Sequence, residues 1–473
     1  MLHATMRRDA VGAATGYFYP KLLECEDMDR FEELVASGGR SILAEAMTRS
    51  LEAFDAKLRE DKPRSWSVHE RAERTLITLV GEVRFTRTVF LDENGRRRTL
   101  ADELLGIPKR ARLSTGAFLW IVRRAAEESY RKTAEAFTSA SGCALSHVTV
   151  MNCVRAECDL LKAADAPSGQ RISQDTLFLE VDGLWVHLQE HEHRNEALPR
   201  FLYEQTRKTV SFELKIAALY AGKRKVAPGR YARDGLALTC SKGDAETFWE
   251  ETFKLVEDSY ELDDVERIWL GADGGGWCGP GRLEEKVPEG CEVSYSLDPF
   301  HIMQKICRAF PEGPQRDWAV NLAVRRKPLR LARMCRRAAP KVKSERRTKR
   351  MRELESYMES NASAVRFPRP SLGTMEGTNA HVGAARLKGQ GRSWSRAGAE
   401  AMCLVRCALA TGRALLAPDK GALFTQKEQQ AAFADTVRSA RGVQARVGRG
   451  YLPPHQAATG SLKTAAGFRA RSC

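Results

Sequence analysis

Two aspartates, Asp182 and Asp273, occur in matching local sequences. Asp182 lies in LEVDGLW and Asp273 in WLGADGGGW, so each follows an apolar run and precedes glycine. A single Asp–Gly pair most often marks a turn, but the matched contexts predict that both carboxylates project from strand ends into one cleft. Neighbouring acids repel each other, and a divalent cation relieves that repulsion. Carboxylate oxygens suit Mg²⁺, and two such ions can bind the attacking and leaving oxygens of a phosphoryl transfer.

A third acid would complete such a metal site, and Glu376 in GTMEGTN is the candidate. Strand-like runs surround the two aspartates: TLFLEVDGLWVHLQ, KTVSFELKIAALYAG, LALTCSKG and RIWLGADGGGWC. GDAETFWEETFKLVEDSYEL has helical spacing, and CEVSYSLDPFHIMQKICRAF indicates a strand followed by a helix. This order predicts an α/β layer architecture with a mixed sheet, formed by residues 172–314 and 366–440.

The segments before this core have a different pattern. Residues 1–74 are predicted to be mainly helical. Within residues 75–165, the alternation of Val83, Phe85, Thr88 and Phe90 before an ENG turn predicts a small β-hairpin.

The stretch from Glu128 to Arg155 has the layout of a helix-turn-helix, with Gly142 in the turn and Ser146 as the cap of the second helix. The inward residues would be Tyr130, Ala134, Phe137, Val148, Val150 and Val154. A second helix in a major groove would bring His147, Thr149 and Asn152 to DNA. The alternative is an ordinary helical hairpin.

Positive charge is localised rather than general. The chain has 473 residues, 76 Lys and Arg against 61 Asp and Glu, and a net charge of +15. Fourteen basic residues and one acid lie between Arg325 and Arg352, and six basic residues without an acid lie in 441–473, which leaves −4 for the remainder. We therefore expect a basic α-helical insertion at 315–365 and a basic mobile tail at 441–473. The candidate DNA contacts of the insertion are Arg325, Arg326, Arg336, Arg337, Arg346 and Arg347, although a run of charge is often only a solvated face.

The composition argues against a disulfide-rich, a zinc-ribbon and a membrane protein. The twelve cysteines include no CxxC pair, which argues against a zinc ribbon or a disulfide framework. The chain has no run of eighteen apolar residues and no signal-like amino terminus. A reducing, intracellular compartment is the simplest interpretation.

VDGLWVHLQ, GADGGGWC, LDPFHIMQKI and GTMEGTNAHVGAARLKGQGRSWSRAGAEAM resemble the transposases of ISLre-type insertion sequences, long grouped as an uncharacterised bacterial family. The resemblance runs from about Gly81 to about Leu409. These transposases are similar to Mutator-type enzymes. The resemblance therefore implies a ribonuclease-H-like core whose Asp–Asp–Glu triad falls on Asp182, Asp273 and Glu376, with an all-α insertion between the second and third acids. The basic block lies where that insertion is expected.

The resemblance also implies the activity, which is metal-dependent DNA end cleavage and strand transfer by a homo-oligomer. Two Mg²⁺ ions would be the cofactor, with Mn²⁺ as a substitute, and the partners would be terminal inverted repeats and target DNA. The location that the resemblance implies is the bacterial cytoplasm, in association with the nucleoid. Asp298 and His301 match a D-x-x-H element near the Mutator-type site, while a helix N-cap and a packed histidine are the alternative. A DNA-binding protein without activity, decayed or domesticated, and a structure-specific nuclease on the same core remain alternative functions.

Overall fold

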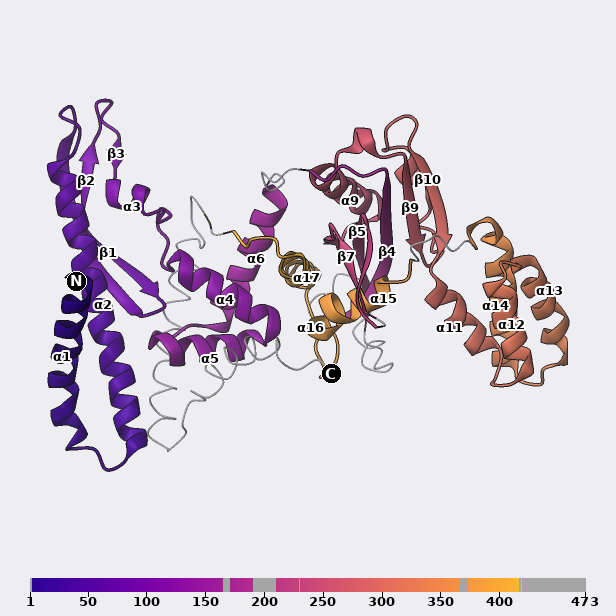
Figure 1. The fold of residues 1–473 in the computed structure, drawn as a ribbon, viewed down its shortest axis with the longest axis horizontal. Coiled ribbons are helices and arrows are strands. Elements are labelled where there is room, and N and C mark those ends of the chain that lie inside the picture. Colours follow the sequence, from indigo (N-terminus) through magenta and orange to yellow (C-terminus); the bar gives the residue numbers. More distant parts are fainter. Residues whose placement is uncertain are drawn as a thin grey trace, which may run out of the picture. The chain divides into compact units, whose positions relative to one another are not determined.

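The computed structural model describes residues 2–164, 171–189, 210–228, 230–365, 372–416 and 418, so the predicted tail at 441–473 lies outside the described residues. The described chain falls into two units (Figure 1): one runs to Glu157 and includes Leu416, and the other runs from Cys158 to Leu415. Among the described helices, none combines the length and the apolar character that a membrane span requires.

The first unit begins with two long helices, followed by a small antiparallel sheet and four more helices. Its elements are α1 (Leu2–Leu22), α2 (Met28–Glu60), β1 (Ser67–Thr78), β2 (Gly81–Leu91), β3 (Arg97–Arg98), α3 (Leu100–Leu104), α4 (Thr115–Glu127), α5 (Tyr130–Ser141) and α6 (His147–Ala163). Helix α2 is fixed to β2 through the buried Asp55, which accepts hydrogen bonds from Thr88 N at 2.8 Å and Thr88 Oγ1 at 2.7 Å.

The hairpin β1–β2 begins at Ser67, earlier than the Thr75 that the sequence indicates. The first half of β1 is exposed or half-buried, and its buried residues begin at Arg74 and alternate from there to Thr78. Apolar alternation is therefore absent where the strand starts, which explains why the boundary predicted at residue 74 is too late.

Helices α5 and α6 form the two helices predicted for the 128–155 stretch. Gly142 ends α5 in the left-handed conformation with φ of 75°, which favours glycine. The Ser146 hydroxyl accepts a hydrogen bond from Thr149 N at 3.0 Å and caps α6. Val148, predicted to be buried, is 38% exposed, whereas Val150 and Val154 are buried.

The second unit is built on a mixed five-stranded sheet in the order β10-β9-β4-β5-β8. Strands β4, β9 and β10 are mutually parallel, while β5 is antiparallel to β4 and β8. The strands are β4 (Thr176–His187), β5 (Ser211–Tyr220), β8 (Ala237–Ser241), β9 (Arg267–Ala272) and β10 (Glu292–Leu297). A two-stranded ribbon, β6 (Gly222–Ala227) and β7 (Arg230–Asp234), lies between β5 and β8 in the chain. The mixed α/β architecture predicted from the sequence is confirmed.

Helices cover both faces of this sheet. On one face, Leu177, Leu179 and Val181 of β4 pack with Phe248 and Trp249 of α9 (Ala245–Ser259). The other face carries the helices that follow the insertion, and Gly383 lies against Leu184 and Ile216 there. The remaining elements of the core are η1 (Leu262–Asp264), α10 (Gly281–Glu284), α15 (Met375–Thr378), the π-helix η4 (Asn379–Ala384), α16 (Ala385–Leu387) and α17 (Arg396–Thr411).

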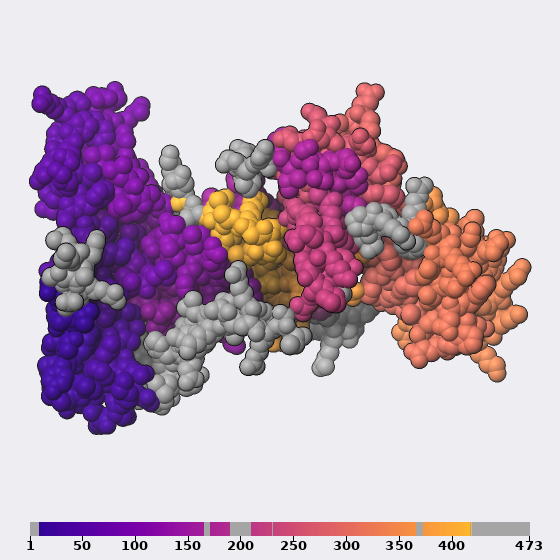
Figure 2. Space-filling model, in the orientation of Figure 1, coloured from indigo at the N-terminus to yellow at the C-terminus, as the bar shows by residue number. Residues whose placement is uncertain are grey.

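The basic segment between β10 and α15 is entirely helical where the structure describes it. It contains α11 (Pro299–Ala309), α12 (Pro314–Val324), α13 (Pro328–Ala338), η2 (Ala339–Lys341), α14 (Glu345–Ser360) and η3 (Ala362–Ala364). Apolar residues of α11 to α14, such as Ile306, Leu331 and Met358, form one buried cluster of their own. Figure 2 shows the surface of these helices in orange. The helical content predicted for 315–365 is thus present.

Candidate functional site

The register of three neighbouring strands brings three acids to the same level of the sheet. Glu180 pairs with Gly271, so continuing the parallel register places Asp182 beside Asp273. Leu297 pairs with Ala272, which likewise places Asp298 beside Asp273. The 2.8 Å hydrogen bond from Asp298 N to Ala272 O extends that second ladder. Asp273 and Asp298 each follow the last residue of their strand, whereas Asp182 lies inside β4, which continues to His187. The predicted position of Asp182 at a strand end is therefore wrong, but the shared register still brings these acids, far apart in the sequence, together.

Asp182, Asp273 and His301 form a group that could hold a metal ion. Each offers one ligand atom, and these atoms lie within 4.8 Å of one another. All three residues are half-buried. Asp298 lies behind the group: its Oδ2 is 3.1 Å from His301 Nδ1, and its Oδ1 accepts a 2.9 Å hydrogen bond from Phe300 N. Asp298 therefore caps α11 and orients His301 at once, so the two interpretations left open by the sequence are compatible.

The group is electrostatically strained without a cation. The pKa of Asp182 is raised to about 6, chiefly by burial and also by the nearby charges of Asp273 and Asp298, while His301 and Gly183 N act to lower it. The hydrogen bond to Asp298, together with the surrounding carboxylates, raises the pKa of His301 although burial lowers it. A protonated His301 therefore partly compensates the acids, and a divalent cation would do so more completely.

Two elements hold the aspartates from outside the sheet. Asn379, at the start of η4, donates from Nδ2 to Asp182 Oδ2 at 2.6 Å. Tyr357 of α14 donates its hydroxyl to Asp273 O at 2.7 Å, so the helical insertion touches the backbone of the second acid. Gly274 permits this approach, since its φ is 86° and a Cβ there would lie 2.9 Å from the Tyr357 ring.

Glu376 is not part of the group formed by Asp182, Asp273 and His301. It lies on α15 with an exposed side chain. Asn379 follows three residues later, and residues spaced by three on a helix are neighbours about 5–6 Å apart at Cβ. The structure thus brings together two of the three predicted acids and places Glu376 one helical turn from the residue that contacts Asp182.

Glu180, Asn379 and Tyr357 support the site and escaped the sequence analysis. Glu180 precedes Asp182 by two residues in LEVDG, so the two side chains share a face of β4; an acid inside an apolar strand was the available signal. Asn379 follows Glu376 at helical spacing. Tyr357 gave no signal, because its contact with Asp273 joins segments 84 residues apart.

The predicted DNA contacts differ in accessibility. In α6, His147 is exposed and Asn152 half-buried, but Thr149 is 5% exposed and its Oγ1 lies 3.0 Å from Ser146 Oγ. The prediction that Thr149 reaches DNA is therefore wrong, since the helical phase puts it inside and Val148 outside.

In the insertion, Arg325, Arg326, Arg337 and Arg346 are exposed and Arg347 is half-buried. Arg336 is exposed too, but it donates to Glu355 and Glu359, each at 2.6 Å. Two acids thus already partner its charge, so we expect Arg336 to contribute less to a DNA contact than Arg337.

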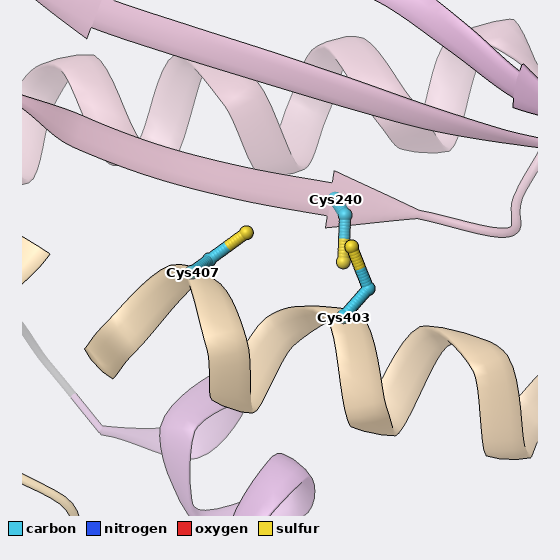
Figure 3. Close-up of side chains that lie close together, drawn as sticks. All are labelled: Cys240, Cys403 and Cys407. Carbon is cyan, nitrogen blue, oxygen red and sulfur yellow. The ribbon is translucent and has the colours of Figure 1, made fainter. Parts of the chain in front are cut away.

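A second group of possible metal ligands consists of buried sulfur atoms. Cys240 of β8 faces Cys403 and Cys407 of α17 (Figure 3), and their Sγ atoms lie within 4.8 Å of one another. Burial raises the pKa of Cys240 well above its usual value. All three residues are at most 1% exposed, so they pack α17 on the sheet as small apolar residues do. Thiolates would suit a soft ion such as Zn²⁺ or Cu⁺ rather than Mg²⁺.

Comparisons with known proteins place these residues in a family. The family model described as "Uncharacterised protein family (UPF0236)" matches residues 24–419. A UPF0236 protein of Caldanaerobacter subterraneus subsp. tengcongensis is 26% identical over 391 residues, covering 80% of this chain and 76% of the relative. A UPF0236 protein encoded in the vanSb 3′ region of Streptococcus gallolyticus is 22% identical, covering 78% and 80%.

Among solved structures, the Drosophila P element transposase strand transfer complex aligns with a TM-score of 0.22 and 10% identity, covering 64% of this chain and 81% of that chain. The family model, by contrast, spans most of the sequence, including Asp182, Asp273 and Glu376. The chain belongs to the uncharacterised protein family UPF0236.

Proposed function

We propose that this chain is a metal-dependent DNA transposase of the Asp–Asp–Glu type, with a ribonuclease-H-like core. The observation that carries the proposal is the convergence of Asp182, Asp273 and His301 within 4.8 Å at one edge of a mixed sheet. The all-helical basic insertion supports it, because it lies between Asp273 and Glu376 in the chain and contacts Asp273 through Tyr357. The partners would be terminal inverted repeats and target DNA.

The donor atoms fit a hard divalent cation. Asp182 and Asp273 supply carboxylate oxygens, and Asn379 Oδ1 is buried without a hydrogen-bond partner among the described residues. This unpartnered amide oxygen beside Asp182 would supply a further oxygen ligand of the kind that Mg²⁺ and Mn²⁺ prefer. Asp182 and Asp273 would hold the ions, and a turn of the Glu376 side chain would add the third carboxylate. Two bound Mg²⁺ ions would supply Lewis-acid activation of the scissile phosphodiester.

The side chains of the chain itself would have distinct tasks in this mechanism. Asn379 holds Asp182, and Asp298 orients His301 so that its imidazolium can donate a hydrogen bond to a DNA phosphate. In cleavage, a water oxygen attacks the phosphorus and the 3′ oxygen leaves as a hydroxyl. In strand transfer, that 3′ hydroxyl attacks a target phosphodiester and displaces its 3′ oxygen. The same acids serve both displacements.

The test uses purified full-length protein and labelled DNA of the element ends. Asp182→Asn, Asp273→Asn and Glu376→Gln should each lower the rate of Mg²⁺-dependent cleavage by more than about 100-fold, beyond the loss typical of residues that only support metal ligands. DNA binding should persist in all three. Asp263→Asn, which changes an exposed acid of η1, is the matched control. Strand transfer retained by Asp182→Asn would contradict the assignment of Asp182 as a catalytic acid.

The exposed position of Glu376 is the observation that favours the alternative of a DNA-binding protein without catalytic activity. Binding of end DNA by the wild-type chain, without cleavage in Mg²⁺ or Mn²⁺, would support that alternative. Products that are cut but never joined to a target would instead indicate a structure-specific nuclease.

A further inference from the structure

The ribbon β6–β7 concentrates positive charge within two short strands. Residues 222–227 and 230–234 include five cations and one acid, which are Lys223, Arg224, Lys225, Arg230, Arg233 and Asp234. Arg224, Lys225 and Arg230 are exposed. Tyr231 is also 61% exposed, and the neighbouring strand exposes Val226 by 53%. An exposed aromatic ring among cations is a common feature of surfaces that bind nucleic acid.

The pairing of the two strands places like charges opposite one another. Lys223 pairs with Arg233 and Lys225 with Tyr231, so these four side chains share one face of the ribbon. Like charges directly opposite each other destabilise a ladder. Asp234 is 3.4 Å from Arg224 Nε, and the carboxylate of Glu180 attracts the cations of Lys223 and Arg233. The side chains of Arg224, Lys225 and Arg230 are exposed, where an outside partner can meet them. The ribbon therefore favours an anionic partner.

The inner end of the ribbon is fixed to the helix that carries Glu376. Arg233 NH1 donates to Thr378 Oγ1 at 2.7 Å and to Thr374 Oγ1 at 3.3 Å. Thr374 N in turn donates to Glu180 Oε2 at 2.9 Å, and Glu180 is on the strand of Asp182. Hydrogen bonds thus connect the inner end of the ribbon to the helix that carries Glu376 and to the strand that carries Asp182.

We propose that the β6–β7 ribbon binds the sugar–phosphate backbone of DNA as it enters the acid site. Arg224, Lys225 and Arg230 contact phosphates, and the Tyr231 ring packs against a sugar or base. The proposal rests on the function proposed above, because it assigns a DNA contact to the same site. Charge complementarity favours DNA as the occupant, and the link through Arg233 explains why the charge is located here.

The first test measures binding of element-end DNA as a function of salt, in buffer without divalent metal. Each phosphate contact adds about 0.9 to the slope of log K against log salt, so Arg224→Ala/Lys225→Ala/Arg230→Ala should reduce the slope by about 2 to 3. Lys254→Ala/Arg267→Ala/Arg282→Ala removes the same charge from α9, the start of β9 and α10, and should leave the slope near the wild-type value. Thermal melting checks that both triple variants are folded.

The second test addresses the aromatic ring. Tyr231→Ala should weaken binding of single-stranded DNA by about fivefold or more, the lower end of the loss for a stacked base, while Tyr231→Phe should restore it. Equal slopes for the two triple variants would overturn the proposal, even if an acidic protein partner were found to bind the ribbon.

The two proposals can fail separately. A reduced slope in the ribbon variant, with no cleavage by the wild type, would support the ribbon as a DNA contact and remove only the catalytic assignment. Cleavage by the wild type, together with an unchanged salt slope in the ribbon variant, would contradict only the proposal that the ribbon contacts DNA.

Discussion

Glu180 is the residue on which the geometry around the acids most depends. It is 2% exposed and lies two residues before Asp182 on β4. Its carboxylate accepts hydrogen bonds from Tyr220 Oη at 2.6 Å and from Gly373 N at 2.7 Å, and also from the backbone and hydroxyl of Thr374. Those two residues lead into α15. One buried carboxylate thus fixes where the helix of Glu376 and the adjoining Asn379 begin relative to Asp182.

Replacing Glu180 should therefore affect both stability and catalysis. In Glu180→Gln one oxygen becomes an amide donor that faces backbone N–H groups, so we expect a loss of about 2 kcal/mol or more in the free energy of unfolding. Cleavage should fall further than DNA binding, because α15 is no longer anchored. Tyr220→Phe, which removes one donor and keeps the carboxylate, should cost about 1 kcal/mol. Urea unfolding and Mg²⁺-dependent cleavage measure the two effects, and equal behaviour of the two variants would contradict this role.

At the scale of residues, sequence patterns identified the acids but not their supports. Asp182 and Asp273 were recognisable because each ends an apolar run before glycine, and parallel register then brings such positions together. Glu376 was a candidate because two acids call for a third, and the resemblance then assigned it to the triad, although nothing in GTMEGTN itself requires an acid at a site. Asn379 and Tyr357 act through contacts 197 and 84 residues away in the chain, which no local pattern encodes.

Among the elements, α17 is held to the sheet by an ion-pair cluster centred on Glu400. Glu400 is 4% exposed and accepts from Lys242 Nζ at 2.6 Å and from Lys162 Nζ at 3.0 Å. Lys242 N also donates to it at 3.1 Å. Burial raises the pKa of Glu400, but the hydrogen bonds from Lys242 and Lys162 outweigh that effect and lower it overall. The cluster joins α17, the loop after β8 and the end of α6.

This cluster makes stability depend on pH in a definite direction. Since the pKa is lower in the folded than in the unfolded chain, Glu400 stabilises the fold above the unfolded value of about 4.3, and this contribution is lost as the pH falls through the folded value. Glu400→Gln should cost about 2 kcal/mol at pH 7, less than for a fully buried pair because both lysines are partly exposed. Urea unfolding should show that the difference in the free energy of unfolding between the wild type and Glu400→Gln disappears below about pH 4. If that difference stays constant with pH, the ion pairs are not its cause.

At the scale of elements, periodicity succeeded where one face of an element is buried. The strands of the core were predicted from their apolar runs, whereas the helices of the insertion were expected from its basic composition and from the resemblance. The start of β1 was missed because its first residues are polar and exposed. The helix α6 was predicted, but the face that it buries was not: Thr149, expected outside, is buried, and Val148, expected inside, is exposed. The ribbon β6–β7 gave no apolar signal, and its charge went unnoticed beside the larger basic block.

At the scale of the whole molecule, the described chain supplies one group that combines carboxylates at metal-binding distance. An insertion sequence has two ends, and each end must be cut and joined. If one acid group serves one end, complete transposition requires at least two chains acting on the same DNA. Under the proposed function, this reasoning leads to the same expectation as the resemblance to ISLre-type transposases, a homo-oligomer, which stays a prediction.

Mixing experiments test this requirement without any knowledge of the assembly's geometry. Asp182→Asn chains, which should bind DNA but not cleave it, are mixed with wild-type chains at constant total concentration on a substrate carrying both ends. If each chain processes one end, products joined at both ends fall with the square of the wild-type fraction, whereas single-end cleavage falls in direct proportion to it. A linear decline of the double-end product would mean that one chain processes both ends in turn, because each inactive chain would then remove only its own share of complete events.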